Sequence, residues 1–252
     1  MAILMRCLFQ GRELAARLDG ENLYVLDENY PARIEETGER LALSDIEAFL
    51  PPVRPGKVVA IGLNYRDHAA EFHLPIPEDP VSFLLAPSSV AAHEQEVHAP
   101  YPSFEMGFEA ELAVVIGAEA FRVPEAEALE YVLGFTCAND ITARNIQRRD
   151  GQWGRSKSYP TFTPLGPWLV TGLDPSDLRI TMNINGEIRQ RASTANCIFS
   201  VGKIIESLSD YMVLNPGDVI ITGTPGGVGL LERGDIMEVE ISGIGILRNV
   251  MA

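Results

Sequence analysis

Two glutamates separated by one residue stand at the start of a long apolar run. Glu109 and Glu111 lead into Leu112-Ala113-Val114-Val115-Ile116, a pattern typical of a strand that is buried on both faces. Side chains two residues apart on a strand point to the same face, so we expect these carboxylates to be neighbours. Solvent exposure of both acids is the plain alternative. Like charges beside a buried strand repel unless a cation joins them, and a hard divalent ion would do so.

A third carboxylate closes the next apolar stretch. Asp140 follows residues 133–139, whose composition predicts another buried strand. Acids at strand ends often belong to functional sites, although turns use the same residue types. A set of three carboxylates without histidine or cysteine favours Mg²⁺, Mn²⁺ or Ca²⁺ over zinc.

The charge balance reverses just beyond Asp140. Residues 141–160 carry one acid, Asp150, and five cations: Arg144, Arg148, Arg149, Arg155 and Lys157. In a chain with a net charge of -15, this cluster indicates an anion-binding patch, whereas a solvated helix face is the plain alternative. Glycines around Trp153 and prolines between residues 160 and 167 favour an irregular loop over a long helix.

One histidine lies at helical spacing from a carboxylate. His68 and Glu71 follow a predicted strand and would share one face of a short helix. The carboxylate would then orient the imidazole and raise its basicity, as a general base requires, whereas a surface pair is the plain alternative. We expect surface or structural roles for the histidines without ligand spacing, which are His73, His93 and His98.

A glycine-rich segment spans residues 223–229. It lacks the Gly-Lys-Ser/Thr sequence of a phosphate-binding loop, and no helical pattern follows it. Its backbone amides and the Thr224 side chain could hold a carboxylate, although a turn between strands is the plainer interpretation.

A mainly β chain must position these residues. Further short apolar segments predict strands at residues 58–61, 81–84, 112–116, 168–170, 180–184, 218–222 and 236–241. Helices are expected at residues 124–132 and from the N-cap Ser200 to Met212, and Asn185-Gly186 predicts a hairpin turn. Many strands without regular strand–helix alternation predict an α+β, mainly β fold.

A proline-rich segment divides the chain. Three prolines between residues 51 and 55 oppose regular structure there. We therefore expect a small β-rich N-terminal appendage at residues 1–55 and a catalytic domain at residues 56–252.

Composition limits the cellular setting and the partners. The chain has 252 residues, 46% of them hydrophobic, which is typical of a soluble globular protein with a sizeable core. Its 35 acidic residues against 20 basic ones oppose binding to nucleic acid or to an anionic membrane. The three cysteines lack disulfide or zinc spacing, and we expect buried thiols. We therefore expect a cytoplasmic protein that binds small molecules or copies of itself.

Five ordered blocks of residues carry a family resemblance. They read IGLNYRDH from Ile61, EAELAVVIG from Glu109, NDITAR from Asn139, KS at Lys157, and NPGD from Asn215 followed by TGTP from Thr222. From about residue 58 onward the chain thereby resembles the fumarylacetoacetate hydrolase family. The resemblance implies a mixed β-sandwich roll, a homodimer, and Mg²⁺ or Mn²⁺ held by Glu109, Glu111 and Asp140.

The same resemblance implies roles for the other candidate residues. The catalytic residues would be His68, Glu71 and Lys157, with the first two on a short helix that orders over the substrate. Substrate oxygens would be held by Arg144, Gln147 and Thr224. Many members of the family have lysine where this chain has Leu85, in the segment Phe83-Leu84-Leu85.

The resemblance also implies a reaction class. We expect hydrolytic C–C cleavage of an acylpyruvate-type 2-oxo or enol acid through a metal-stabilised enolate, with His68 deprotonating the attacking water. The close alternative is an isomerase or decarboxylase of 2-hydroxyhepta-2,4-diene-1,7-dioate or 5-carboxymethyl-2-oxo-hex-3-ene-1,7-dioate in aromatic catabolism by the homoprotocatechuate pathway. A binding protein without catalysis is a third alternative, which the crowding of unpaired charges disfavours.

Overall fold

A large mixed sheet forms the frame of the protein in the computed structural model, which describes residues 1–71 and 75–252. Its strands follow the order β4 (Glu36–Ala42), β3 (Asn22–Leu26), β2 (Arg12–Asp19), β1 (Ile3–Phe9), β14 (Thr163–Val170), β12 (Val132–Asn139), β11 (Ala110–Ile116), β17 (Val219–Ile221), β6 (Val58–Gly62) and β7 (Val81–Leu85). Two short strands join it laterally, β5 (Ala48–Leu50) beside β1 and β8 (Val90–Ala91) beside β14.

Two smaller sheets and several short helices complete the architecture. One sheet has the order β16 (Glu187–Ser193), β15 (Arg179–Ile184), β19 (Ile236–Ile241), β20 (Gly245–Met251) and β9 (Glu96–Val97), and the other has β13 (Thr142–Ala143), β10 (Met106–Phe108) and β18 (Gly229–Leu230). The α-helices are α1 (Arg66–Glu71), α2 (Arg144–Asp150), α3 (Gly154–Lys157) and α4 (Val201–Ser209). The 3-10 helices are η1 (Leu43–Asp45), η2 (Pro87–Ser89), η3 (Glu125–Tyr131) and η4 (Thr194–Asn196).

Strand β11 is buried on both faces, as its uninterrupted apolar sequence predicts. Leu112 and Val114 belong to the core shared with β15, β19 and β20 of the five-stranded sheet. Ala113 and Val115 point the other way, into a second apolar cluster with β6 and β14. A strand enclosed in this way is rigid, because moving it would expose apolar groups on two sides.

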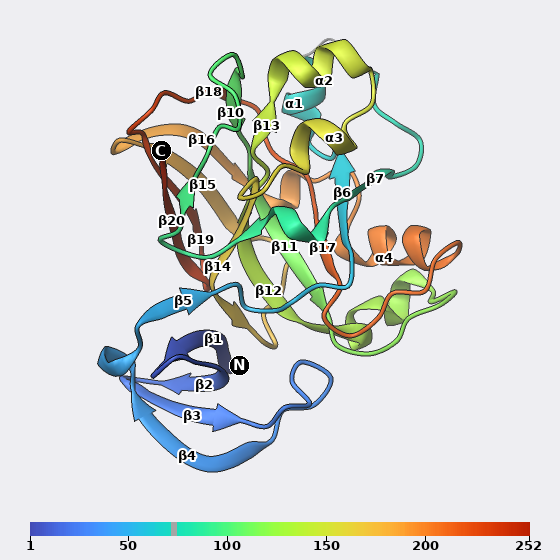
Figure 1. The fold of residues 1–252 in the computed structure, drawn as a ribbon. Helices are drawn as coiled ribbons and strands as arrows, with labels where there is room; N and C mark the ends of the chain where they lie inside the picture. Colours follow the sequence, from blue (N-terminus) through green and yellow to red (C-terminus); the bar gives the residue numbers. More distant parts are fainter. Residues whose placement is uncertain (72–74) are drawn as a thin grey trace.

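The predicted α+β, mainly β fold is confirmed. The N-terminal strands β1 to β4 lie together at one end of the molecule, and α1, α2 and α3 gather at the other (Figure 1). Strand β1 pairs antiparallel with β14, so the N-terminal strands extend the main sheet. They also enclose a small apolar cluster of their own around Met5 and Leu23. The division into domains at residues 55 and 56 stays a prediction.

The proline-rich stretch that was expected to be irregular is in part a strand. Strand β14 begins at Thr163, and Pro164 pairs beside Ala91 of the short strand β8. Pro167 falls in the irregular part of the pairing with β12, between Gly166 and Val170. The prolines are accommodated because neither interrupts a continuous ladder of hydrogen bonds.

The helices are shorter than their sequence patterns suggested. The segment expected to be helical at residues 124–132 is the 3-10 helix η3, which Pro124 precedes. Ser200 does cap α4, accepting a hydrogen bond from the Lys203 amide, but the helix ends at Ser209 rather than Met212. No helix among the described residues is long and apolar enough to cross a membrane.

The predicted hairpin turn is present, whereas one of the three cysteines differs from its expectation. Asn185 and Gly186, with φ of 53° and 83°, connect β15 to β16 as the predicted hairpin. Cys7 and Cys137 are buried, whereas Cys197 is only partly buried, which corrects the expectation of three buried thiols. His73 lies outside the described residues.

Candidate active site

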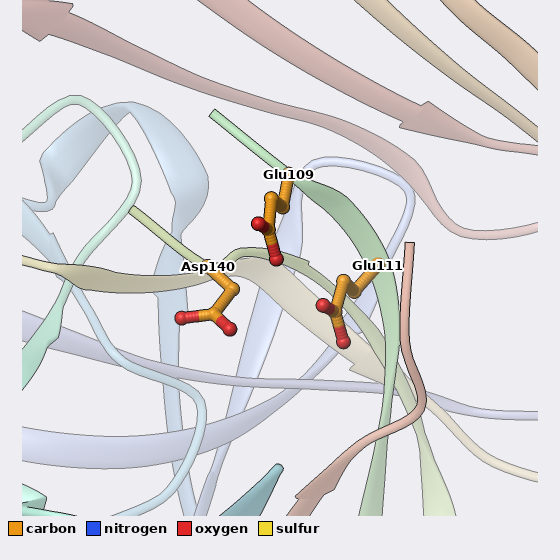
Figure 2. Close-up of side chains that lie close together, drawn as sticks. All are labelled: Glu109, Glu111 and Asp140. Atoms are coloured by element: carbon orange, nitrogen blue, oxygen red, sulfur yellow. The ribbon is translucent and has the colours of Figure 1, made fainter. Parts of the chain in front are cut away.

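Three carboxylates converge at the end of the strand pair β11–β12. Glu109, Glu111 and Asp140 place ligand atoms within 4.8 Å of one another, and all three residues are buried. Figure 2 shows their side chains turned toward a common space. The alternative that the two glutamates face solvent is therefore wrong.

The antiparallel pairing of β11 with β12 explains why Glu109 and Asp140, 31 positions apart, meet. Ala110 lies opposite Asn139. Glu109, which precedes Ala110, and Asp140, which follows Asn139, therefore come together. The Asp140 amide donates to the Glu109 carbonyl at 2.9 Å, and the Glu109 amide donates to Asn139 Oδ1 at 3.0 Å. The backbones that carry Glu109 and Asp140 are thus held in a fixed register.

Two cations lie inside this acidic cluster. Lys157 Nζ, delivered by α3, is 2.8 Å from Glu109 Oε2 and 2.5 Å from Asp140 Oδ2. Arg144 Nη1, at the start of α2, is 2.6 Å from Glu109 Oε1. Lys157 is almost fully buried, so its charge is neutralised by these carboxylates rather than by water.

The pKa values of the three carboxyl groups shift in different directions in this environment. Burial opposes ionisation of Glu109, but Lys157 and Arg144 outweigh it and lower the pKa of Glu109 to about 2. Burial raises the pKa of Asp140 to about 6, with Lys157 opposing and Glu109 adding to the rise. Burial, together with the charges of Asp140 and Glu109, raises the pKa of Glu111 well above its ordinary value. Negative charge at Glu111 and Asp140 is therefore under-compensated.

The donor set fits a hard divalent cation. Asp140 Oδ1 is buried and has no hydrogen-bond partner among the described residues. An unpaired buried acceptor is costly, and a cation between the three carboxylates would satisfy it. Because all the ligand atoms would be oxygens, the set suits Mg²⁺, Mn²⁺ or Ca²⁺. The role of these residues as ligands stays a prediction.

Helix α1 brings the histidine and its carboxylate to the same place. His68 Nδ1 lies 3.4 Å from Glu71 Oε2, and His68 is largely buried. The Gly227 amide, in the glycine-rich segment, donates to Glu71 Oε2 at 3.3 Å. The predicted pairing is thus present, and a backbone amide helps to hold its carboxylate.

A single cavity of about 320 Å³ joins these groups. The predicted site residues that line it are His68, Glu109, Glu111, Asp140, Arg144, Gln147, Lys157 and Thr224. Glu71 contacts His68 but is not part of the lining. Phe83 and Trp153 form an aromatic wall, with ring centroids 5.4 Å apart in an edge-to-face arrangement.

The five cations expected to form one patch have separate positions. Arg144 and Lys157 lie in the cavity and contact the carboxylates, as described above. Arg148 lines the cavity but pairs with Glu105 at 2.6 Å. Arg149 and Arg155 pair with Asp150 on the surface, between the short helices α2 and α3. The basic segment is therefore neither a single anion-binding patch nor one solvated helix.

The glycine-rich segment does hold a carboxylate, but it is the protein's own. The Gly223 amide donates to Glu111 Oε2 at 2.6 Å. Gly223 has φ of +97°, and a Cβ there would lie 2.8 Å from Asn64 Cβ, so this position requires glycine. The segment is therefore a support of the acidic cluster.

Three contributors escaped the sequence reasoning. Trp153 packs onto Gly62, where an added Cβ would lie 2.1 Å from the indole. Phe83 belongs to a strand whose pattern predicted only structure. Gln190 is the buried residue of β16, a strand otherwise exposed or half-buried, and no pattern in Arg189-Gln190-Arg191 distinguishes it. Contacts between distant segments, rather than local patterns, identify these residues.

Comparison with known proteins gives a family and three named relatives. A family model described as fumarylacetoacetate (FAA) hydrolase C-terminal matches residues 57–252. The 2,4-didehydro-3-deoxy-L-rhamnonate hydrolase of Sphingomonas sp. (strain SKA58) is 45% identical over 205 residues, covering 77% of this chain and 72% of the relative. The mitochondrial oxaloacetate tautomerase FAHD2A of Homo sapiens is 40% identical over 221 residues, covering 83% and 70%.

Structural similarity extends over the whole chain. The crystal structure of 2-hydroxyhepta-2,4-diene-1,7-dioate isomerase from Mycobacterium marinum superimposes with a TM-score of 0.92 at 37% identity, covering 100% of this chain and 98% of that one. The three named proteins are a hydrolase, a tautomerase and an isomerase, so similarity at this level does not select one reaction.

Proposed function

The chain belongs to the fumarylacetoacetate hydrolase family and is therefore an enzyme, and from this premise we propose that it is a divalent-metal-dependent hydrolase. Its substrate would be an acylpyruvate-type 2-oxo or enol acid, cleaved at a C–C bond. The observation that supports this best is the joining of the three-carboxylate cluster and the His68–Glu71 pair in one cavity.

The cation would be Mg²⁺ or Mn²⁺, held by Glu109, Glu111 and Asp140. When bound, it would stabilise negative charge on a substrate oxygen as a Lewis acid. We also propose a homodimer, on the family resemblance alone, and a cytoplasmic location, on the composition and cysteine spacing of the sequence.

The remaining polar groups have complementary tasks in this proposal. His68, oriented by Glu71, would take the proton of the attacking water. Arg144 Nη2 is buried without a partner among the described residues, so it would donate to a substrate carboxylate. Gln147 lines the same cavity as Arg144 and would hold a second substrate oxygen. Lys157, whose catalytic role stays a prediction, would oppose protonation of Glu109 and Asp140 and hold both carboxylates in place.

A second candidate is isomerisation or decarboxylation of a seven-carbon oxo- or hydroxy-dioic acid. It is favoured by the whole-chain similarity to the Mycobacterium marinum protein, which is named for such an isomerisation. In the isomerisation of a 2-hydroxy-diene, His68 would take the proton of the enol hydroxyl and return it to a substrate carbon. In the decarboxylation it would protonate the carbon that loses CO₂, and no water would attack in either reaction.

Product analysis tests the proposed hydrolysis. An acylpyruvate in its enol form is incubated with the purified protein in Mg²⁺ or in EDTA, while its ultraviolet absorbance is followed and the products are identified by NMR. Mg²⁺-dependent formation of pyruvate and a carboxylic acid is the expected result. Loss of the enol signal without cleavage would replace hydrolysis by isomerisation or tautomerisation.

Metal dependence is tested separately by calorimetry. Wild-type protein should bind Mg²⁺, and Glu111→Gln should bind it much more weakly because one ligand charge is lost. Absence of heat in both proteins would refute the metal-dependent mechanism.

A further inference from the structure

The side chain of Gln190 joins the acidic strand to the glycine-rich segment. Its Oε1 accepts a hydrogen bond from the Ala110 amide at 2.9 Å, between the two glutamates of the cluster. Its Nε2 lies 2.8 Å from Thr224 Oγ1 and 2.8 Å from the Pro225 carbonyl oxygen. All of these contacts are buried, so each group depends on protein partners.

These partners determine which way the amide points. The Ala110 N–H can only donate and the Pro225 carbonyl can only accept. If the Gln190 amide were turned over, its NH₂ group would face the Ala110 N–H and its oxygen would face the Pro225 carbonyl oxygen. Both Nε2 protons are therefore assigned, one to Pro225 and one to Thr224.

The directions of the hydrogen bonds of the Thr224 hydroxyl follow from this assignment. Its oxygen accepts from Gln190, and it donates its only proton to the Ala110 carbonyl at 2.9 Å. One lone pair then remains on a side chain that lines the cavity. The Thr224 hydroxyl can therefore accept a further hydrogen bond but has no proton left to donate.

We propose that Gln190 is a positioning residue of the active site, which makes the Thr224 hydroxyl a hydrogen-bond acceptor toward the substrate. The substrate oxygen that it meets would then carry a proton, as an enol hydroxyl or an alcohol does and an ionised carboxylate does not. This inference rests on the proposed function, because it takes the cavity as the site of a metal-bound 2-oxo or enol acid.

Two small ligands of similar size separate the two hydrogen-bond polarities. Glycolate has a carboxylate and a hydroxyl donor, whereas oxalate has two carboxylates and no donor. Their dissociation constants are measured calorimetrically on the full-length protein loaded with Mn²⁺. Thr224→Val should weaken glycolate about fivefold relative to oxalate, the effect of one hydrogen bond, and Thr224→Ser should retain the wild-type preference. An equal loss for both ligands, a larger loss for oxalate or no change would overturn the assignment.

The Gln190→Leu variant tests the positioning role. Although Gln190 does not contact the ligand, the variant should weaken glycolate binding about fivefold relative to oxalate binding. The Mn²⁺ dissociation constant should stay within about twofold of wild type. Gln95→Leu is the matched control, because Gln95 also accepts from a backbone amide, that of Ala92, but lies outside the cavity. An unchanged preference, or a parallel loss of Mn²⁺ and both ligands, would show that Gln190 has no such role.

The outcomes also separate this inference from the function on which it rests. Wild-type protein that binds neither Mn²⁺ nor oxalate would overturn the proposed function and the inference together. Wild-type protein that binds both, with variants that keep its ligand preference, would overturn the inference alone.

Discussion

Lys157 Nζ lies 2.5 Å from Asp140 Oδ2, so the candidate metal site contains a buried cation of the protein itself. The same ammonium group lies 2.8 Å from Glu109 Oε2. Burial would favour the neutral amine, but Asp140 and Glu109 raise the pKa of Lys157 above its ordinary value. Lys157 therefore holds two of the three carboxylates together before any ion is bound.

Removing this charge should destabilise the metal-free protein. Lys157→Met should lower the free energy of unfolding by about 3 kcal/mol at neutral pH, because the buried Asp140 loses its cationic partner and Glu109 keeps only Arg144. Urea denaturation in EDTA measures this, and added Mg²⁺ should restore part of the loss. Lys203→Met is the control, since Lys203 pairs with Glu206 on the surface, and it should change stability by less than about 1 kcal/mol. Equal stability of the two variants would contradict a structural role for Lys157.

Catalysis and metal binding should be separable at His68. His68→Ala should lower kcat by about 100-fold or more, as loss of a general base does, while Mg²⁺ affinity stays near that of wild type. Glu71→Gln should have a smaller effect because the imidazole remains. His98→Ala, at an exposed side chain outside the cavity, is the control for both measurements. Turnover by His68→Ala at the wild-type rate would remove the pair from the mechanism.

The stability of the metal-free protein should decrease as the pH rises through about 6. The pKa of Asp140 is raised from 3.8 to about 6, so its protonated form is favoured in the folded state. That contribution is complete below the unfolded pKa and is lost as the pH rises through the folded one. Glu109, with a pKa of about 2, is ionised throughout this range.

Denaturation in EDTA between pH 5 and 8 measures this dependence. Asp140→Asn should reduce the slope, with the remainder due to Glu111, whose pKa is also raised, whereas Asp19→Asn, at an exposed acid, should leave it unchanged. Mg²⁺ affinity of the wild type should increase over the same range, since the ion competes with protons. A slope that Asp140→Asn does not alter would refute the assignment to Asp140.

The wall formed by Trp153 should depend on the absence of a side chain at Gly62. Gly62→Ala would place a Cβ 2.1 Å from Trp153 Cζ3, so the indole must move. We expect a loss of about 1–3 kcal/mol in the free energy of unfolding and a higher KM. In a Trp168→Phe background, a red shift of fluorescence would report the movement of Trp153. Combining Gly62→Ala with Trp153→Ala should recover stability relative to the sum of the single changes, and simple additivity would contradict the contact.

Local pattern was sufficient for the elements that carry most of the candidate residues. The apolar run after Glu111 predicted a strand buried on both faces, and alternation on that strand predicted the proximity of Glu109 and Glu111. Helical spacing likewise predicted that His68 would meet Glu71. These relationships involve residues at most three positions apart, where the geometry of the element alone sets the distance.

Longer-range relationships depended on how the elements pack. Lys157 belongs to a basic segment of the sequence, but α3 inserts it among carboxylates while Arg155 stays on the surface. Trp153 and Gln190 were not expected at the site at all. Each meets its partner through a contact between segments that lie far apart in the chain, and such contacts leave no periodic trace in the sequence. Local periodicity thus determined the strands and the pairs of neighbouring residues, whereas burial of those strands against each other decided which charges and amides share the cavity.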